Sequence, residues 1–430
     1  MNTAPNSPTP TKTVMNSTPS KRRIAIVHDW LPVYGGAERV LEQMLKVYPE
    51  ADVFSLIDAL DDESRKFLNG KPVKTSFVQK LPGGKKYYRH CFPLMPLAIE
   101  QFDFSGYDMV ITSSYAFAKG IITGPRQLHL CYCHSPIRYA WDLQNQYLKE
   151  SKMDRGPLTW FVRSMLHFIR MWDSRTAAGV DAFMANSRFI ARRIEKVYRR
   201  EATVVYPPVN IERFDTCHEK KNYYVTASRL VPYKRMDLII EAFNGMPERE
   251  LVVIGDGPEL PKLRRLAGPN VKVLGWQPQA VLKQHLEQAR GFVFGGEEDF
   301  GIILLEAQAC GTPVIAYGRG GALETVVENK TGLFFGEQSV DSLQGAIAEF
   351  ETREWDALTC RSNAERFSTK IFRDRFQQFV EGEWERFAAV STAVDSEAEG
   401  HRDWRQSMPQ EEMFEEVPQV VRRQQQLLPA

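Results

Sequence analysis

The chain alternates short apolar runs with helical patterns, and it does so in two successive series. Short apolar runs bounded by charge or glycine are typical of buried parallel strands, whereas apolar residues recurring every three or four positions are typical of helices. Strands are predicted at 24–27, 109–112, 128–133, 182–185 and 203–205, and then at 223–227, 251–254, 271–274, 291–294 and 313–316. Helices are predicted at 37–48, 235–244, 259–266, 279–289, 303–310 and 341–350. This alternation indicates an α/β protein with parallel sheets.

The two series meet at Pro207-Pro208, where neither pattern continues. We therefore predict two Rossmann-like, doubly wound domains, 22–207 and 208–365, that face a central cleft. An amphipathic helix is predicted within 366–390. Residues 1–21, rich in Pro, Ser, Thr and Asn, are predicted to be a disordered tail. Residues 391–430 are predicted to be a mostly disordered tail with a short helix at 411–427.

Composition excludes several classes of partner. Among 430 residues, 55 Lys and Arg balance 54 Asp and Glu to a net charge of +1, so nothing favours nucleic acid as a partner. The six cysteines form no C-x-x-C pair and match no zinc spacing, so we expect reduced thiols and no metal site. The chain has no apolar run long enough to span a membrane and no apolar leader, so we expect a cytoplasmic protein.

Two carboxylates eight positions apart, Glu298 and Glu306, form the most informative motif. The pattern places Glu306 on the first turn of a helix and Glu298 on the loop before it. Backbone N–H groups near Phe300, Gly301 and Ile302 would then point out of the helix N-terminus, where anions bind. A carboxylate beside an anion site suits a ligand that is both phosphate and polyol, such as a nucleotide sugar. The alternative is an acidic turn that only stabilises the helix dipole.

Arg229 and Lys234 follow the strand at 223–227, at the edge of the expected cleft. A diphosphate requires cations, and Arg supplies a planar fork whereas Lys supplies a compact charge. The alternative is a pair of solvated surface cations.

Two glycine pairs and one histidine motif complete the candidate site. Gly35-Gly36 precedes the helix at 37–48, and Gly320-Gly321 follows the strand at 313–316. Both pairs would allow a ligand to approach the backbone closely. The alternative is that both pairs only form turns. His134 and Arg138 follow the strand at 128–133, where side chains point into the crevice. The alternative for His134 is a buried structural histidine.

Basic and aromatic residues are interleaved at 79–101 and again at 160–172. This mixture suits an anionic membrane surface. A buried helix whose long cations reach back to solvent is an equal alternative.

These motifs, in their order along the chain, resemble those of the retaining glycosyltransferases of the GT-B fold, family 4, and the resemblance covers residues 23–388. The blocks at 28–31, 35–40, 134–142 and 316–326 are most similar to WbaZ-type mannosyltransferases. The resemblance implies a cytoplasmic, metal-independent enzyme with no bound cofactor. The basic and aromatic segments at 79–101 and 160–172 would place it peripherally on the inner face of the plasma membrane. It would transfer mannose from GDP-mannose to a lipid-linked saccharide in O-antigen or exopolysaccharide assembly. It also implies that the helix within 366–390 crosses back onto the first domain.

The resemblance also implies residue roles. Arg229 and Lys234 would neutralise the diphosphate, Glu306 would bind the ribose, and Glu298 would contact the transferred sugar together with the N–H groups of Phe300 and Gly301. His134 would contact a sugar hydroxyl, and Gly35-Gly36 would border donor and acceptor.

Other activities remain open at this point. The same fold could use UDP-glucose or UDP-N-acetylglucosamine as donor, or could serve a nucleotide-sugar epimerase or an inactive partner subunit. A nicotinamide oxidoreductase is disfavoured because no complete G-x-G-x-x-G follows the strands at 24–27 or 251–254.

Overall fold

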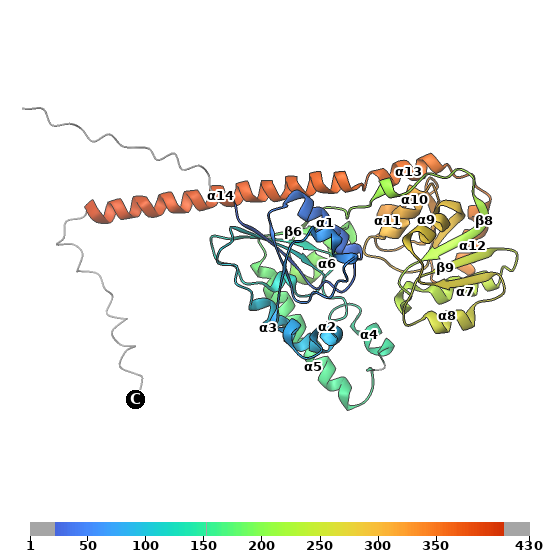
Figure 1. The fold of residues 1–430 in the computed structure, drawn as a ribbon, viewed down its shortest axis with the longest axis horizontal. Coiled ribbons are helices and arrows are strands. Elements are labelled where there is room, and N and C mark those ends of the chain that lie inside the picture. The colour runs from blue at the N-terminus through green and yellow to red at the C-terminus, as the bar shows by residue number, and fades with distance from the viewer. Residues whose placement is uncertain (1–21, 152, 408–430) are drawn as a thin grey trace, which may run out of the picture. The chain divides into compact units, whose positions relative to one another are not determined.

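The computed structural model describes residues 22–151 and 153–407, and the chain up to Arg373 forms one compact unit that contains two parallel sheets. The first sheet lies in the blue-to-green half of the ribbon in Figure 1 and the second in the half that runs from green to orange. The expected α/β class with two Rossmann-like sheets is confirmed.

The first sheet has seven strands in the order β3-β2-β1-β4-β5-β6-β7. Its strands are β1 Ile24–His28, β2 Asp52–Ser55, β3 Val73–Thr75, β4 Met109–Ser114, β5 Leu128–Cys133, β6 Ala182–Ala185 and β7 Ala202–Val204. Its helices are α1 Gly36–Val47, α2 Gly84–Tyr87, α3 Met95–Glu100, α4 Gln144–Glu150, α5 Pro157–Thr176 and α6 Arg188–Tyr198. Short 3-10 turns are η1 Ser64–Leu68, η2 Phe77–Lys80, η3 Tyr88–Leu94, η4 Ala118–Gly120 and η5 Ala177–Gly179.

The second sheet has six strands in the order β10-β9-β8-β11-β12-β13. Its strands are β8 Lys221–Ala227, β9 Glu250–Ile254, β10 Val271–Gly275, β11 Ala289–Phe294, β12 Val314–Tyr317 and β13 Gly332–Phe335. The helices are α7 Met236–Asn244, α8 Leu260–Leu266, α9 Gln279–Gln288, α10 Ile302–Ala309, α11 Ala322–Thr325, α12 Val340–Glu351, α13 Ala357–Glu365 and α14 Thr369–Ser407, with turns η6 Ile211–Arg213 and η7 Pro232–Lys234.

The strand order of each sheet reverses at one point. In the first sheet β1 lies between β2 and β4, and in the second β8 lies between β9 and β11. Ligands of doubly wound folds bind at the carboxyl ends of the strands beside such a reversal. Each half therefore presents one ligand-binding edge.

The central strands, such as β4 and β5, are buried on both faces because helices cover them, which explains their continuous apolar runs. On β5, Cys131 and Cys133 share one face and pack against Phe183 and Ile190. Burial raises the pKa of the Cys131 thiol to about 12. These two cysteines are therefore core residues whose thiols stay protonated near pH 7.

Several elements differ from the sequence-based expectations, among them helices α2 to α5, α11 and α13, which were not predicted. Strands β2, β3 and β13, each of three or four residues, were not predicted. Helix α14 continues to Ser407, so the prediction that the disordered tail starts at 391 was wrong for 391–407. The predicted tail at 1–21 and the predicted helix at 411–427 lie outside the described residues.

At its start, α14 contacts the first half of the chain. The Phe372 ring packs edge-on against Tyr132, and Arg373 Nη1 donates to Gln43 Oε1 at 2.6 Å. The packing of the rest of 366–390 on the first domain stays a prediction.

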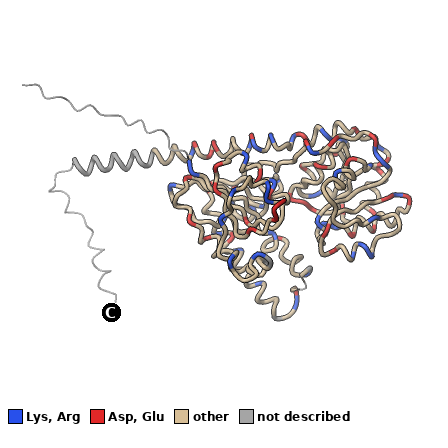
Figure 2. Tube along the Cα trace, in the orientation of Figure 1, with Lys and Arg blue, Asp and Glu red and all other residues tan. Residues whose placement is uncertain are grey.

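Charge and hydropathy add two observations. Lys, Arg, Asp and Glu are interspersed along the described chain (Figure 2), as the near-zero net charge suggests. Within residues 22–407, apart from 152, no helix is both long and apolar enough to cross a membrane.

Candidate active site

A cavity of about 670 Å³ lies where the carboxyl edges of the two sheets meet. The first half contributes the start of α1 and the loop after β5, and the second half contributes the loops after β8, β9, β10 and β11. The predicted site residues that line it are Gly36, His134, Arg138, Arg229, Lys234, Glu298, Phe300, Gly301 and Ile302. Gly35, Glu306, Gly320 and Gly321 are not among the lining residues.

Glu298 and Lys234 form an ion pair on the wall of this cavity, and their side chains are 13% and 12% exposed. Glu298 lies in the loop between β11 and α10, whereas Lys234 ends the turn η7 that follows β8. Two segments about 65 residues apart therefore bring a carboxylate and a cation to one point, as the motif spacing suggested.

Burial, with a smaller contribution from the nearby Arg138 guanidinium, lowers the pKa of Lys234 to about 7. Arg229 lies on the same wall but is exposed, and its guanidinium has no hydrogen-bond or ion-pair partner among the described residues. The cavity thus offers one fixed charge at Arg229 and one titratable charge at Lys234 to an anionic ligand.

The sequence predicted that Glu306 lies in the first turn of a helix. Helix α10 begins at Ile302, so Glu306 lies instead in its second turn. Gly301 caps the helix with φ of 93°, a left-handed conformation that a residue with a Cβ rarely adopts. The Glu306 carboxylate is buried and accepts a 2.5 Å hydrogen bond from Arg39 Nη1 of α1. Glu306 is thus buried beneath the cavity and paired across the two halves.

Asp299 is a second acidic residue of the cavity wall that the sequence reasoning did not nominate. Its carboxylate pairs with Arg138 from the loop after β5 and with Arg193 Nη1 from α6 at 3.3 Å. A carboxylate between two guanidinium groups joins the two halves of the chain. Arg138 therefore lies in the cavity as predicted, but already has an acidic partner.

The two predicted glycine pairs play different parts. The Gly35 N–H donates to Glu38 Oε2 at 2.9 Å, as in the glutamate half of a capping box, so the N–H of Gly35 is already satisfied. Gly36 lines the cavity. Gly321 packs under the Glu298 loop: its N–H donates to Glu298 O at 2.7 Å, and a Cβ there would lie 2.3 Å from Phe300 Cα. Gly321 therefore supports the wall from behind and does not form it.

His134 reaches the cavity from the end of β5. Its carbonyl accepts a 2.9 Å hydrogen bond from Asn186 Nδ2, and its Nε2 lies 2.9 Å from Ser113 Oγ. Burial, together with His28, lowers the pKa of His134 to about 3. The ring is therefore neutral near pH 7 and acts through hydrogen bonds.

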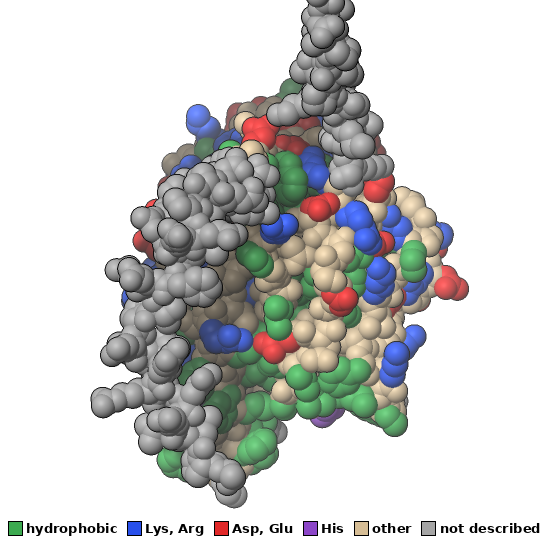
Figure 3. Space-filling view, turned by 90° about the vertical axis from the view of Figure 1, so that its left-hand side faces the viewer, with side chains coloured by type: hydrophobic (Ala, Val, Ile, Leu, Met, Phe, Trp, Pro, Cys, Tyr) green, Lys and Arg blue, Asp and Glu red, His purple; other side chains and the backbone are tan. Residues whose placement is uncertain are grey.

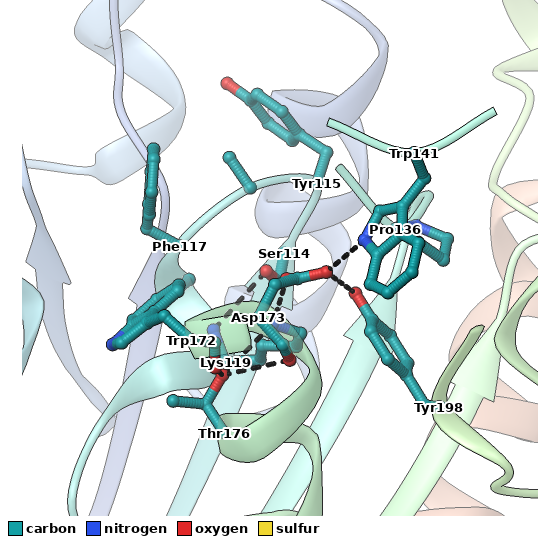
Figure 4. A network of polar contacts seen from close by, with 12 residues as sticks. Ser114, Tyr115, Phe117, Lys119, Pro136, Trp141, Trp172, Asp173, Thr176 and Tyr198 are labelled. Carbon is teal, nitrogen blue, oxygen red and sulfur yellow. Dashed lines mark hydrogen bonds and ion pairs between the residues drawn. The ribbon is translucent and has the colours of Figure 1, made fainter. Parts of the chain in front are cut away.

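A buried ion pair, Lys119 with Asp173, holds the loop that carries Arg138 (Figure 4). The Asp173 carboxylate also accepts from Trp141 Nε1 at 2.7 Å and from the Tyr198 hydroxyl at 2.9 Å. Nearby, Arg170 Nη1 donates to the carbonyl of Ala140 at 2.8 Å. The inner side of α5 thereby fixes residues 138–141 through side chains that sequence reasoning did not single out.

Trp276 is another lining residue without a sequence signal of its own. It follows β10, lines the cavity and is 70% exposed. A flat, exposed ring on a cavity wall is suited to stacking on an aromatic ligand. Among the residues that the structure describes, no cluster of three His, Cys, Asp or Glu side chains is placed to hold a metal ion.

Two family models match consecutive parts of the chain. The model "Glycosyltransferase Family 4" matches residues 34–213, and "Glycosyl transferases group 1" matches residues 210–367. The two matches follow each other through the first and second sheets, and the second contains both the Arg229/Lys234 and the Glu298/Glu306 motifs.

Curated relatives and solved structures agree with these matches. The chain is 33% identical over 217 residues to a GDP-mannose-dependent alpha-(1-6)-phosphatidylinositol monomannoside mannosyltransferase of Mycobacterium tuberculosis, which covers 43% of the chain and 56%, about half, of that relative. It is 25% identical to the GDP-Man:Man(3)GlcNAc(2)-PP-Dol alpha-1,2-mannosyltransferase of Xenopus laevis, over 83% of the chain and 86% of the relative. The structure of Anabaena HepE in complex with UDP has a TM-score of 0.60 at 18% identity, covering 84% of this chain and all of that one.

Proposed function

Because the chain is a glycosyltransferase of family 4 with the GT-B fold, we propose that it transfers mannose from GDP-mannose to a lipid-linked saccharide, with retention of anomeric configuration. The observation that carries the proposal is the cavity wall on which Arg229, Lys234 and Glu298 meet. The donor assignment is supported by the two GDP-mannose-dependent relatives. Assembly of a cell-surface polysaccharide is the process that such a reaction would serve.

The two cations would act on the leaving group. Charge develops on the diphosphate as its bond to the anomeric carbon breaks, and fixed cations stabilise that charge most in the transition state. A bound diphosphate would keep Lys234 protonated and would compete with Glu298 for it. The N–H groups at the start of α10 would add partial positive charge. On this proposal the reaction needs no metal ion.

Glu298, once released from Lys234, would be free to accept hydrogen bonds from hydroxyls of the transferred sugar. Retention would follow from attack on the same face that the diphosphate leaves. The acceptor oxygen bonds to the anomeric carbon, the bond to the phosphate oxygen breaks, and the departing phosphate takes the proton of the acceptor hydroxyl. We nominate no protein nucleophile.

The acceptor assignment draws support from an exposed apolar face on α5. Trp160 and Phe161 are 80% and 66% exposed, and Phe168 is exposed on the same helix. Exposed cations, Arg155 and Arg163, lie beside them. Hydrophobic side chains also gather at the lower edge of the view in Figure 3, the side on which α5 begins in Figure 1. Aromatic and basic residues together suit an anionic lipid surface.

Only part of the interleaved segment at 160–172 faces outward. Trp172 turns inward, where its Nε1 donates to Glu100 at 2.8 Å, and Arg170 is committed to the loop at Ala140. The membrane proposal therefore rests on the outer face of α5 alone.

Vesicle co-sedimentation tests this face. Trp160→Ser with Phe161→Ser should weaken binding to anionic vesicles by at least tenfold, since each side chain buries an apolar area worth about 1.5–3 kcal/mol. Leu358→Ser in α13, where the leucine is 56% exposed, is the matched control and should bind as the wild type does. Equal binding by the double variant and the wild type would contradict the membrane proposal.

Donor hydrolysis by the purified chain tests the activity. We expect slow, selective turnover of GDP-mannose over UDP-glucose, UDP-galactose and UDP-N-acetylglucosamine. Preference for a uridine donor would keep the family and discard the mannosyl assignment, whereas epimerised sugar without transfer would indicate an epimerase. Lys234→Ala and Glu306→Ala should each abolish turnover while the circular dichroism spectrum stays that of the wild type; full activity in either variant would contradict the site assignment.

A further inference from the structure

Two histidines at the carboxyl edge of the first sheet share one serine hydroxyl. His28 Nδ1 lies 3.0 Å from Ser113 Oγ, and Ser113 Oγ lies 2.9 Å from His134 Nε2. The sheet itself produces this arrangement, because His28 ends β1 opposite Ser113 of β4, and His134 directly follows the neighbouring strand β5. His28 and Ser113 are fully buried, whereas His134 lines the cavity.

A serine hydroxyl has one proton, which constrains both rings. The hydroxyl can donate to only one of the two imidazoles, so the other imidazole must donate to it. In the first arrangement, His28 Nδ1 accepts from the Ser113 hydroxyl and His134 donates to it through Nε2–H. In the second, His28 donates through Nδ1–H and His134 Nε2 accepts. The choice determines whether the second nitrogen of His134, Nδ1, carries a proton.

Glu38 favours the first arrangement. Its Oε1 lies 3.6 Å from His28 Nε2, while its Oε2 accepts the Gly35 N–H. His28 Nε2 is buried and has no hydrogen-bond partner within the described part of the chain. A lone pair on that nitrogen would face a buried carboxylate, whereas an N–H would be attracted to it. A single ring proton on His28 is therefore placed on Nε2 by Glu38, and Nδ1 then accepts from Ser113.

The other charged or titratable groups around these rings do not change this preference. Asp29 is occupied by the N–H groups of residues 115–118, and Tyr115 meets both rings edge-on. Tyr132 meets His134 edge-on, and its hydroxyl donates to a backbone carbonyl.

We propose that the chain Glu38–His28–Ser113 fixes His134 in the Nε2–H tautomer, so that Nδ1 is presented to the cavity as a hydrogen-bond acceptor for one sugar hydroxyl. Glu38, His28 and Ser113 are then positioning residues, and His134 reads a hydroxyl of the transferred hexose. The choice of a sugar hydroxyl rests on the proposed function, whereas the tautomer does not. The neutral state of His134 makes its tautomer a defined property near pH 7.

The tautomer can be measured without substrate. In the full chain labelled with 15N-histidine, the His134 signals, assigned by their loss in His134→Gln, should show a protonated Nε2 and an unprotonated Nδ1. Ser113→Ala should change these signals toward mixed tautomers. Ser114→Ala is the matched control and should leave them unchanged, because the one hydrogen bond of Ser114 Oγ within residues 22–407 comes from the Lys119 N–H. A protonated Nδ1 on wild-type His134, or signals unaffected by Ser113→Ala in a folded protein, would overturn the proposal.

Donor analogues test the consequence. A hydroxyl donates a proton to Nδ1, whereas fluorine cannot, so at one position of mannose the deoxy and deoxyfluoro donors should lose kcat/KM equally, by at least about tenfold. His134→Gln should reduce this loss. A deoxyfluoro donor that restores the rate at that position would show that Nδ1 carries a proton and would overturn the proposal. Failure of any mannose donor to react would instead contradict the proposed function, and the spectrum alone would then decide the tautomer.

Discussion

Raising the pH above 7 should weaken productive capture of the donor, because it removes the proton from Lys234. Burial and Arg138 lower the pKa of this amine from its ordinary 10.5 to about 7. Below pH 7 the ammonium is charged before the donor arrives. Above pH 7 each further unit should lower kcat/KM about tenfold, or about 1.4 kcal/mol, since kcat/KM reports the free enzyme.

The decline in kcat/KM ends where the pH reaches the pKa that Lys234 has in the complex with the donor. If a bound diphosphate restores the ordinary value, the total effect is about 5 kcal/mol. The free energy of unfolding changes with pH in the opposite direction. The unfolded chain binds the Lys234 proton more tightly than the folded chain does. Lys234 therefore destabilises the fold most below pH 7, and this destabilisation disappears as the pH rises toward 10.5.

The assay is donor hydrolysis measured from about pH 6 to about pH 9, the range that brackets the expected pKa. Lys234→Arg is the control, because a guanidinium stays charged throughout. It should turn over more slowly at pH 7, owing to its different shape, but without the alkaline decline. A flat wild-type profile, or the same decline in Lys234→Arg, would refute the reasoning.

Four further substitutions have distinct expected outcomes. Gly321→Ala should destabilise the fold by about 1–3 kcal/mol in urea unfolding and lower kcat/KM, because its Cβ would clash with the Glu298 loop. Gly345→Ala in α12 is the control: a Cβ there has no atom within 4 Å, so this substitution should stabilise the fold by up to about 1 kcal/mol. Asp173→Asn should cost about 3–5 kcal/mol of stability in the same assay, since it leaves Lys119 buried without its ion pair; a loss below about 1 kcal/mol would contradict that account. Trp276→Ala should raise the donor KM about tenfold with little change in kcat, if its ring stacks on the base; an unchanged KM would remove Trp276 from the base site.

The sequence was sufficient for the layout of the sheets because the signal is local. An apolar run such as 128–133 is long enough to indicate a buried strand, and its end then places His134 at the ligand edge. Strand β3 at the sheet edge offers only three partly exposed residues, which no periodicity can distinguish from a loop.

The candidate site was predictable as a set of residues but not as a set of contacts. Arg138 and Asp299 are 161 positions apart, and Arg39 and Glu306 are 267 apart, so their pairing depends on how the two halves meet. The Ser113 bridge likewise depends on the register of β1 against β4. Motif spacing within one loop carries none of this information.

In the Arg39–Glu306 pair, Arg39 of the first half competes with the donor for the Glu306 carboxylate. If Glu306 must bind ribose, only molecules in which Arg39 has let go are competent, and the apparent affinity falls in proportion to their fraction. A pair that favours its bonded state by about 1.4 kcal/mol reduces that fraction to about one tenth. Arg39→Ala should then bind donor more tightly than the wild type in calorimetry, and weaker binding would show that Arg39 helps to hold the nucleotide. The resting population, and not only the contacts made after binding, would set how much donor the enzyme needs.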